Sequence, residues 1–148
     1  MNMKLLSFAV VIIVAIIGLF LFLSWRKTHP TPISIQTVTP FVSENVYITQ
    51  PLPNGLVSSP LIIKGQARGT WYFEASFPVR LMDSNGKQIA VEPAQAQSDW
   101  MTTEFVPFEV TLNFTTPTTN TGTLILEKDN PSSLPKYDAF ISIPIRFR

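Results

Sequence analysis

The sequence contains no cysteine and only one histidine, and these two shortages exclude several kinds of chemistry. Without cysteine, the chain can form no disulfide, thiolate nucleophile, iron–sulfur cluster or cysteine-ligated zinc site. The single histidine, His29, excludes a site with several histidine ligands and argues against a Ser-His-Asp triad. Charge is also scarce, since 14% of the 148 residues are charged and the formal net charge is +1. The chain therefore has no strong basic field for nucleic acid, and its length allows one ordinary domain with a short appendage.

An uncharged apolar run of twenty residues extends from Leu5 to Ser24. A helix of that length spans about 30 Å, which is the thickness of the hydrocarbon layer of a bilayer. In lipid, a helix satisfies all its backbone hydrogen bonds internally. We therefore predict a single transmembrane signal anchor within residues 1–27. Its membrane-interface residues are expected to be Lys4, Trp25, Arg26 and Lys27.

A cleaved signal peptide is the alternative to an uncleaved anchor. Such a peptide has an apolar region of about 7–15 residues and a cleavage site made of small residues. The run here is longer, and the Ser-Trp-Arg-Lys stretch that ends it offers no such site. The flanking charges hardly discriminate between orientations, but an apolar segment at the extreme N-terminus favours export of the polypeptide on its C-terminal side. We expect a cytoplasmic N-terminus and an extracytoplasmic C-terminal domain in a single-pass membrane protein.

Residues 28–43 are rich in proline and threonine and show no helical periodicity. Proline favours an extended, polyproline-like conformation, so we predict a stiff linker in which His29 is solvated and has no role. Beyond Lys27 the chain has eight basic and ten acidic residues. This mild acidity argues against binding to nucleic acid or to an anionic lipid surface.

Residues 44–148 alternate between apolar and polar side chains with a period of two, which is typical of half-buried strands. Turn-forming segments such as Pro-Asn-Gly at 53–55 and Asp-Ser-Asn-Gly at 83–86 separate the strands. Pro78 and Pro144 interrupt two of the patterns and indicate an edge strand or a bulge. We predict an all-β, two-sheet sandwich of about seven strands. The expected strands lie within 46–49, 61–65, 73–81, 87–91, 108–114, 123–127 and 141–147.

The segments that come after the linker resemble a known family. They are VYITQPLPNGLVSSPLIIKGQA (46–67), GQARGTWYFEASFPVRLMDSNGKQIA (65–90), AQAQSDWMTTEFVPFEVTLNF (94–114), GTLILEKDNPSSLPKYD (122–138) and ISIPIRF (141–147). Together they closely resemble the immunoglobulin-like domain of bacterial spore germination proteins. The resemblance implies an immunoglobulin-like β-sandwich on an extracytoplasmic, often membrane-attached bacterial protein. It supplies no catalytic residues, and the Cys…Trp…Cys signature of antibody domains is absent from the sequence.

Acidic residues are the first candidates for catalysis or for metal binding. The carboxylate pairs to consider are Glu104 with Glu109, Asp129 with Asp138, and Glu74 with Glu92. Alternation with core positions places Glu74 and Glu109 on outer strand faces, so we expect no acid/base pair. The 83–86 segment resembles a calcium loop but lacks the later bidentate glutamate, and a hairpin turn explains it. We expect no enzyme activity, metal or cofactor.

Aromatic residues at the predicted strand ends are the best candidates for a binding surface. Trp71, Tyr72 and Trp100 lie near glycine or polar turns, where exposed rings could stack on sugars or anchor a partner. The alternative is that Trp71 and Trp100 cover the open ends of the core. Phe73 continues an inward-facing stripe and is expected in the core. We therefore predict a non-catalytic interaction module that binds an envelope protein, with binding of a cell-wall glycan such as peptidoglycan as the alternative.

Overall fold

The computed structural model describes residues 16–22, 24 and 39–148, and the chain divides into two units, Met1–Gln36 and Thr37–Arg148. In the first unit, residues 16–22 and 24 are helical and their side chains are exposed. Among the described residues, no helix is long and apolar enough to cross a membrane. His29 and the expected interface residues Lys4, Trp25, Arg26 and Lys27 lie outside the described residues. The anchor therefore remains a prediction from the sequence.

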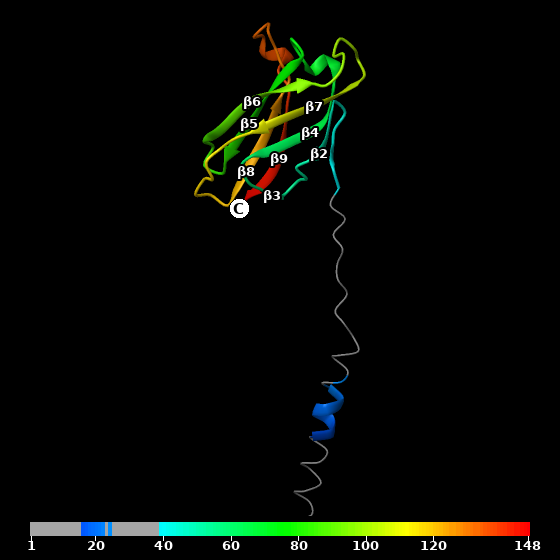
Figure 1. Ribbon diagram of the computed structural model, residues 1–148, viewed down its shortest axis with the longest axis vertical. Coiled ribbons are helices and arrows are strands. Elements are labelled where there is room, and N and C mark those ends of the chain that lie inside the picture. The colour runs from blue at the N-terminus through cyan, green and yellow to red at the C-terminus, as the bar shows by residue number, and fades with distance from the viewer. Residues whose placement is uncertain (1–15, 23, 25–38) are drawn as a thin grey trace, which may run out of the picture. The chain divides into compact units, whose positions relative to one another are not determined.

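The second unit is built from strands, as predicted, with two short 3₁₀ turns and no α-helix among its described residues (Figure 1). Nine strands form one hydrogen-bonded sheet in the order β1-β2-β4-β7-β6-β5-β8-β9-β3. The strands are β1 (Phe41–Val42), β2 (Val46–Gln50), β3 (Gly55–Val57), β4 (Leu61–Arg68), β5 (Ser76–Asp83), β6 (Gln88–Ala96), β7 (Phe105–Leu112), β8 (Thr121–Glu127) and β9 (Phe140–Phe147). The 3₁₀ turns are η1 (Gly69–Trp71) and η2 (Pro135–Tyr137).

The two sheets expected from the sequence are two halves of one curled sheet. The halves are joined where β6 meets β7, and only Gln95–Glu109 and Ala96–Phe108 are paired there. Buried side chains from both halves form a single core cluster. Within it, the Phe77 ring of β5 packs edge-on against the Phe108 ring of β7, with centroids 5.0 Å apart. The all-β class is confirmed, whereas the expected two sheets and about seven strands are corrected to two layers of one hydrogen-bonded sheet of nine strands.

Alternating burial along the strands agrees with the pattern of the sequence. In β5, Phe77, Val79 and Leu81 are fully buried, and the residues between them are partly exposed. The same alternation runs along β4, β7, β8 and the second half of β9. Because successive side chains of a strand point to opposite faces, the buried set forms the inner face of each strand. Burial of this face is the main stabilising contribution to the domain.

One predicted stripe begins too early, because Phe73 does not belong to β5. Glu74 and Ala75 have positive φ values of 48° and 62°. Phe73 and Ser76 exchange backbone hydrogen bonds of 3.0 and 3.1 Å around them. This is a two-residue turn with both central residues in the left-handed region, a type I′ geometry. The turn reverses the chain before β5, and Phe73 is 40% exposed rather than in the core.

The prolines occupy positions where a missing N–H is tolerated. Pro78 lies in an inner strand rather than at the predicted edge, and it faces Pro93 of β6. Two prolines can face each other in antiparallel strands only at a non-hydrogen-bonded position, since neither has an N–H to donate. Pro144 faces Thr123 of β8, and its carbonyl oxygen accepts a 2.7 Å hydrogen bond from the Asn54 N–H, just before the residues of β9 that pair with β3. The prediction of an edge strand or a bulge is therefore wrong for both prolines, because β5 and β9 each have a neighbouring strand on both sides and the register does not shift at Pro78 or Pro144.

The connections between strands gather at two ends of the domain (Figure 1). We call residues 43–45, 69–75, 97–104 and 128–139 the distal loops, which lie at the top in Figure 1. We call residues 51–54, 58–60, 84–87 and 113–120 the proximal loops. Strand β1 runs towards the distal end, since Phe41 pairs with Ile48, and Val42 pairs with Tyr47. The polypeptide thus enters the domain from the side away from the distal loops.

Candidate functional site

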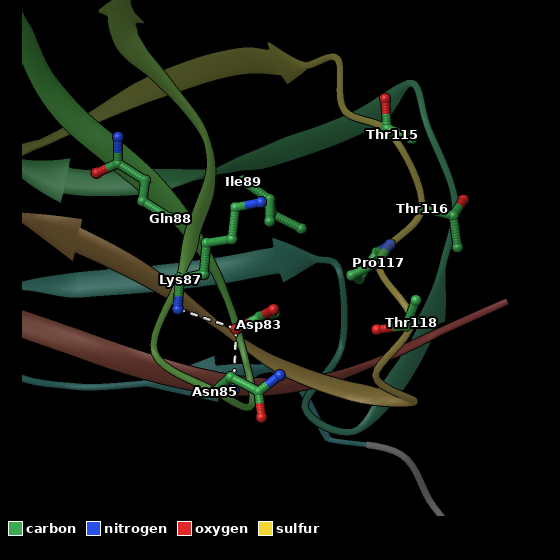
Figure 2. Close-up of a pocket in the computed structure, with 9 residues that line it drawn as sticks. All are labelled: Asp83, Asn85, Lys87, Gln88, Ile89, Thr115, Thr116, Pro117 and Thr118. Atoms are coloured by element: carbon green, nitrogen blue, oxygen red, sulfur yellow. Dashed lines mark hydrogen bonds between the residues drawn. The ribbon is translucent and has the colours of Figure 1, made fainter.

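A hollow of about 540 Å³ lies at the proximal end, between the β5–β6 hairpin and the loop after β7. Figure 2 shows Thr115–Thr118 on one side of it and Asp83–Ile89 on the other. The hollow forms here because β6 and β7 are paired only near the opposite end, at Gln95 and Ala96, so the two strands separate below. Its lining is mainly polar and includes both an acidic and a basic side chain, Asp83 and Lys87.

Asp83 is the carboxylate among the lining residues, and its hydrogen bonds are used within the hairpin. One oxygen, Oδ1, accepts hydrogen bonds of 2.9 Å from the backbone N–H groups of Asn85 and Lys87 (Figure 2). Gly86 has a φ of 79° and donates its N–H to the Asp83 carbonyl oxygen at 3.1 Å. The hairpin interpretation of this segment is confirmed. The hollow brings no second carboxylate to Asp83, so its lining forms no acid/base pair.

Trp71 and Tyr72, two of the three predicted contact residues, lie in the core rather than at the surface. Trp71 is 3% exposed and Tyr72 is 4% exposed. The Tyr72 hydroxyl donates a 2.8 Å hydrogen bond to the Val106 carbonyl oxygen, and burial raises the pKa of that hydroxyl well above its usual range. The Tyr72 ring also packs edge-on against Phe77. Because both rings cover the end of the apolar core, neither has a face available for stacking on a sugar.

The third predicted residue, Trp100, is half-buried and packs against the same core. The alternative in which Trp71 and Trp100 cover the end of the core is therefore the one that the structure favours. The indole N–H of Trp71 is buried and has no hydrogen-bond partner within the described part of the chain. A buried donor without a partner is costly, which indicates that ring burial outweighs this loss at the end of the core.

A different set of apolar side chains is exposed on the distal loops. Met101 is 77% exposed and Phe140, at the start of β9, is 68% exposed. Phe73 stands on the two-residue turn before β5, and two more residues belong to the β8–β9 loop. Large exposed apolar side chains that gather at one end of a domain are typical of interaction surfaces. We call this set the apolar patch, and its members are Phe73, Met101, Leu134, Tyr137 and Phe140.

Backbone hydrogen bonds hold the distal loops to one another. The Gly69 N–H donates to the Glu104 carbonyl oxygen at 2.9 Å, which joins the β4–β5 and β6–β7 loops. The Asp129 N–H donates to the Trp71 carbonyl oxygen at 3.0 Å, which joins the β4–β5 and β8–β9 loops. A side chain at Gly69 would collide with the carbonyl groups of the β6–β7 loop. The three loops that carry the apolar patch are therefore in contact.

The β8–β9 loop is further braced by Asn130. Its Nδ2 group donates to the Leu134 carbonyl oxygen at 3.0 Å and to Asp138 Oδ1 at 2.7 Å. The Lys128 N–H closes the base of the loop with a 2.8 Å hydrogen bond to the Ala139 carbonyl oxygen. A surface that is ordered before binding loses less conformational entropy on association. This bracing therefore suits the apolar patch to binding.

Two of the carboxylates considered as acid/base candidates, Glu104 and Glu109, lie against cationic side chains. Glu109 lies 2.9 Å from Lys64, and Glu104 lies 3.7 Å from Arg68, so both carboxylates have cationic partners. Glu74, on the β4–β5 loop, acts electrostatically on Asp129, on the β8–β9 loop. Burial raises the pKa of the Asp129 carboxyl, and the Glu74 carboxylate raises it further, while a hydrogen bond from the Asn130 backbone lowers it. No group of three or more acidic or histidine side chains suited to a metal ion occurs among the described residues.

The family comparison agrees with this architecture. The family model of the immunoglobulin-like domain of bacterial spore germination matches residues 45–133, which is more than half of the chain. The chain belongs to this family. Searches of the curated proteins and of the solved structures returned no match. The matched region extends from β2 through β8 and includes most of the distal loops, whereas the resemblance over 141–147 lies beyond it.

Proposed function

We propose that this chain is a membrane-anchored, non-catalytic interaction module that presents its immunoglobulin-like domain outside the cytoplasmic membrane and binds a partner through the distal loops. The apolar patch carries this proposal. Four of its five side chains come from three loops that hydrogen bonds hold together, and the fifth, Phe140, begins β9 directly after one of these loops. Immunoglobulin-like domains commonly bind through loops gathered at one end.

The path of the chain supports the same surface. Strand β1 runs towards the distal loops, so the described part of the chain enters the domain from the opposite side. The apolar run from Leu5 to Ser24 supports an anchor, because its length and lack of charge suit a bilayer. The spore-germination family supports the extracytoplasmic side.

Binding through the distal loops is tested by photo-crosslinking of the full-length chain in its own cells. A photoreactive residue replaces Met101 or Phe140 in the patch, and Asn85 or Thr118 at the proximal end serves as the matched exposed control. We expect an adduct of one defined mass from the two patch positions and none from the controls. Adducts from the proximal positions alone, or equal labelling at all four, would contradict the proposal.

The anchor and its orientation are tested separately. Protease added to intact spheroplasts should remove the domain, and the chain should stay in the membrane fraction after alkaline extraction. Cleavage of the domain only after lysis would contradict the predicted orientation. Release of the chain by alkali would contradict the predicted membrane anchor.

A further inference from the structure

The acidic residues of the domain are concentrated around the apolar patch. The distal loops carry six carboxylates and two lysines, a formal charge of −4. The proximal loops carry a single charged residue, Lys87. The domain is therefore electrically polarised along its strands, with the negative end at the patch. The distal carboxylates are Glu44, Glu74, Asp99, Glu104, Asp129 and Asp138.

Glu74 and Asp129 are two of these carboxylates that lack an ion-pair partner within the described part of the chain. They belong to loops joined by the hydrogen bond between the Asp129 N–H and the Trp71 carbonyl oxygen, and burial and then the Glu74 carboxylate raise the pKa of Asp129. No ion pair shorter than 4.0 Å involves either residue within the described part of the chain, in contrast to Glu104, which has Arg68. Glu74 also occupies a left-handed conformation on the type I′ turn, next to the exposed Phe73. This turn therefore carries an exposed apolar ring and an exposed carboxylate on consecutive residues.

The charge decides between the possible occupants of the patch. A second copy of the chain would bring the same carboxylates against each other, and like charges in an interface are unfavourable. An anionic lipid surface would be repelled for the same reason. A positively charged partner is attracted, and its cations would relieve the repulsion between Glu74 and Asp129.

We infer that the distal loops bind a cationic protein segment. In this complex, an apolar residue of the segment contacts Phe73, Met101 and Phe140 of the apolar patch, while flanking lysines or arginines face Glu74 and Asp129. This inference rests on the proposed function and specifies the chemistry of the partner. Apolar contacts supply most of the binding free energy, and the charges favour one class of partner and speed association.

The test is a selection of random peptides of about twelve residues, displayed on phage, against the full-length chain in detergent micelles. The selected peptides should combine aromatic or aliphatic residues with lysine or arginine. Glu74→Gln should weaken their binding about five- to tenfold, with a similar loss for Asp129→Asn, since tenfold corresponds to one well-placed charge contact. Glu92→Gln, an exposed glutamate on β6, is the matched control and should leave binding unchanged. Added salt should weaken wild-type binding more than binding by the Glu74→Gln variant.

The outcomes separate this inference from the proposed function. Selected peptides without basic residues, whose binding is lost with Met101→Ser and Phe140→Ser, would overturn the inference and leave the function standing. Binding that is unaffected by those two apolar substitutions would overturn both. Self-association through the distal loops in sedimentation experiments, or binding of the domain to anionic vesicles, would also overturn the inference.

Discussion

Replacing Ala75 by glycine should stabilise the domain, although it removes a side chain. Ala75 has a φ of 62°, and an L-residue in the left-handed region loses about 1–2 kcal/mol relative to a right-handed conformation. Glycine removes that cost but adds about 0.4–1 kcal/mol of conformational entropy to the unfolded chain. We therefore expect Ala75→Gly to raise the free energy of unfolding by about 0.5–1 kcal/mol.

The matched control reverses this change at the other hairpin. Gly86 has a φ of 79°, and a Cβ atom added there would meet no atom within 4 Å, so strain in its own backbone is the main effect. Gly86→Ala should lower the free energy of unfolding by about 1 kcal/mol. Urea titration of the full-length chain in detergent, followed by tryptophan fluorescence, measures both variants. A destabilised Ala75→Gly variant together with an unaffected Gly86→Ala variant would refute the assigned turn conformations.

Three further predictions concern the core and the acidic pair. Phe77→Ala should cost about 3–5 kcal/mol in the same urea titration, because it removes the ring that contacts both Tyr72 and Phe108; a cost no larger than that of a surface substitution would contradict this packing. Gly122→Ala should cost about 2–3 kcal/mol, because the new methyl group would collide with the Met82 carbonyl and the Phe147 ring. Asp129→Asn should raise the free energy of unfolding near neutral pH, because burial and then Glu74 raise the pKa of Asp129 and so disfavour its charged form in the folded state. That gain should shrink as the pH falls through the pKa of Asp129, and a gain that grows in acid would show the opposite sign.

The strand pattern could be predicted because a strand's two faces are encoded locally. The alternation from Phe77 to Leu81 and from Phe108 to Leu112 requires only that one face be buried, so it survives whatever the strands pair with. The turn at 83–86 was also recognisable, since Gly86 supplies the positive φ that this hairpin needs. The turn at Glu74 and Ala75 could not be recognised because neither residue is typical of the left-handed region. Its formation depends on the contacts of the surrounding loops, such as the hydrogen bond from the Ala96 N–H to the Ala75 carbonyl oxygen.

The candidate site could not be predicted from the sequence to the same degree. Trp71, Tyr72 and Trp100 are large rings near turns, a pattern equally compatible with an exposed contact surface and with the end of a core. Only the folded arrangement shows that Trp71 and Tyr72 are buried and that Phe73 is exposed in their place. Glu74 and Asp129 are far apart in the chain, so no local pattern signals that Glu74 affects the pKa of Asp129.

The amino-acid sequence alone determined the all-β class, the inner faces of the strands, the apolar N-terminal run and the family, because each depends on the order of residues within a short segment or on whole-domain similarity. The tertiary structure decided that the sheet is a single curled one, which loops come together at each end, and which aromatic and acidic side chains face solvent there. These properties depend on contacts between residues that are distant in the chain, and such contacts exist only after the sheet has closed over its core.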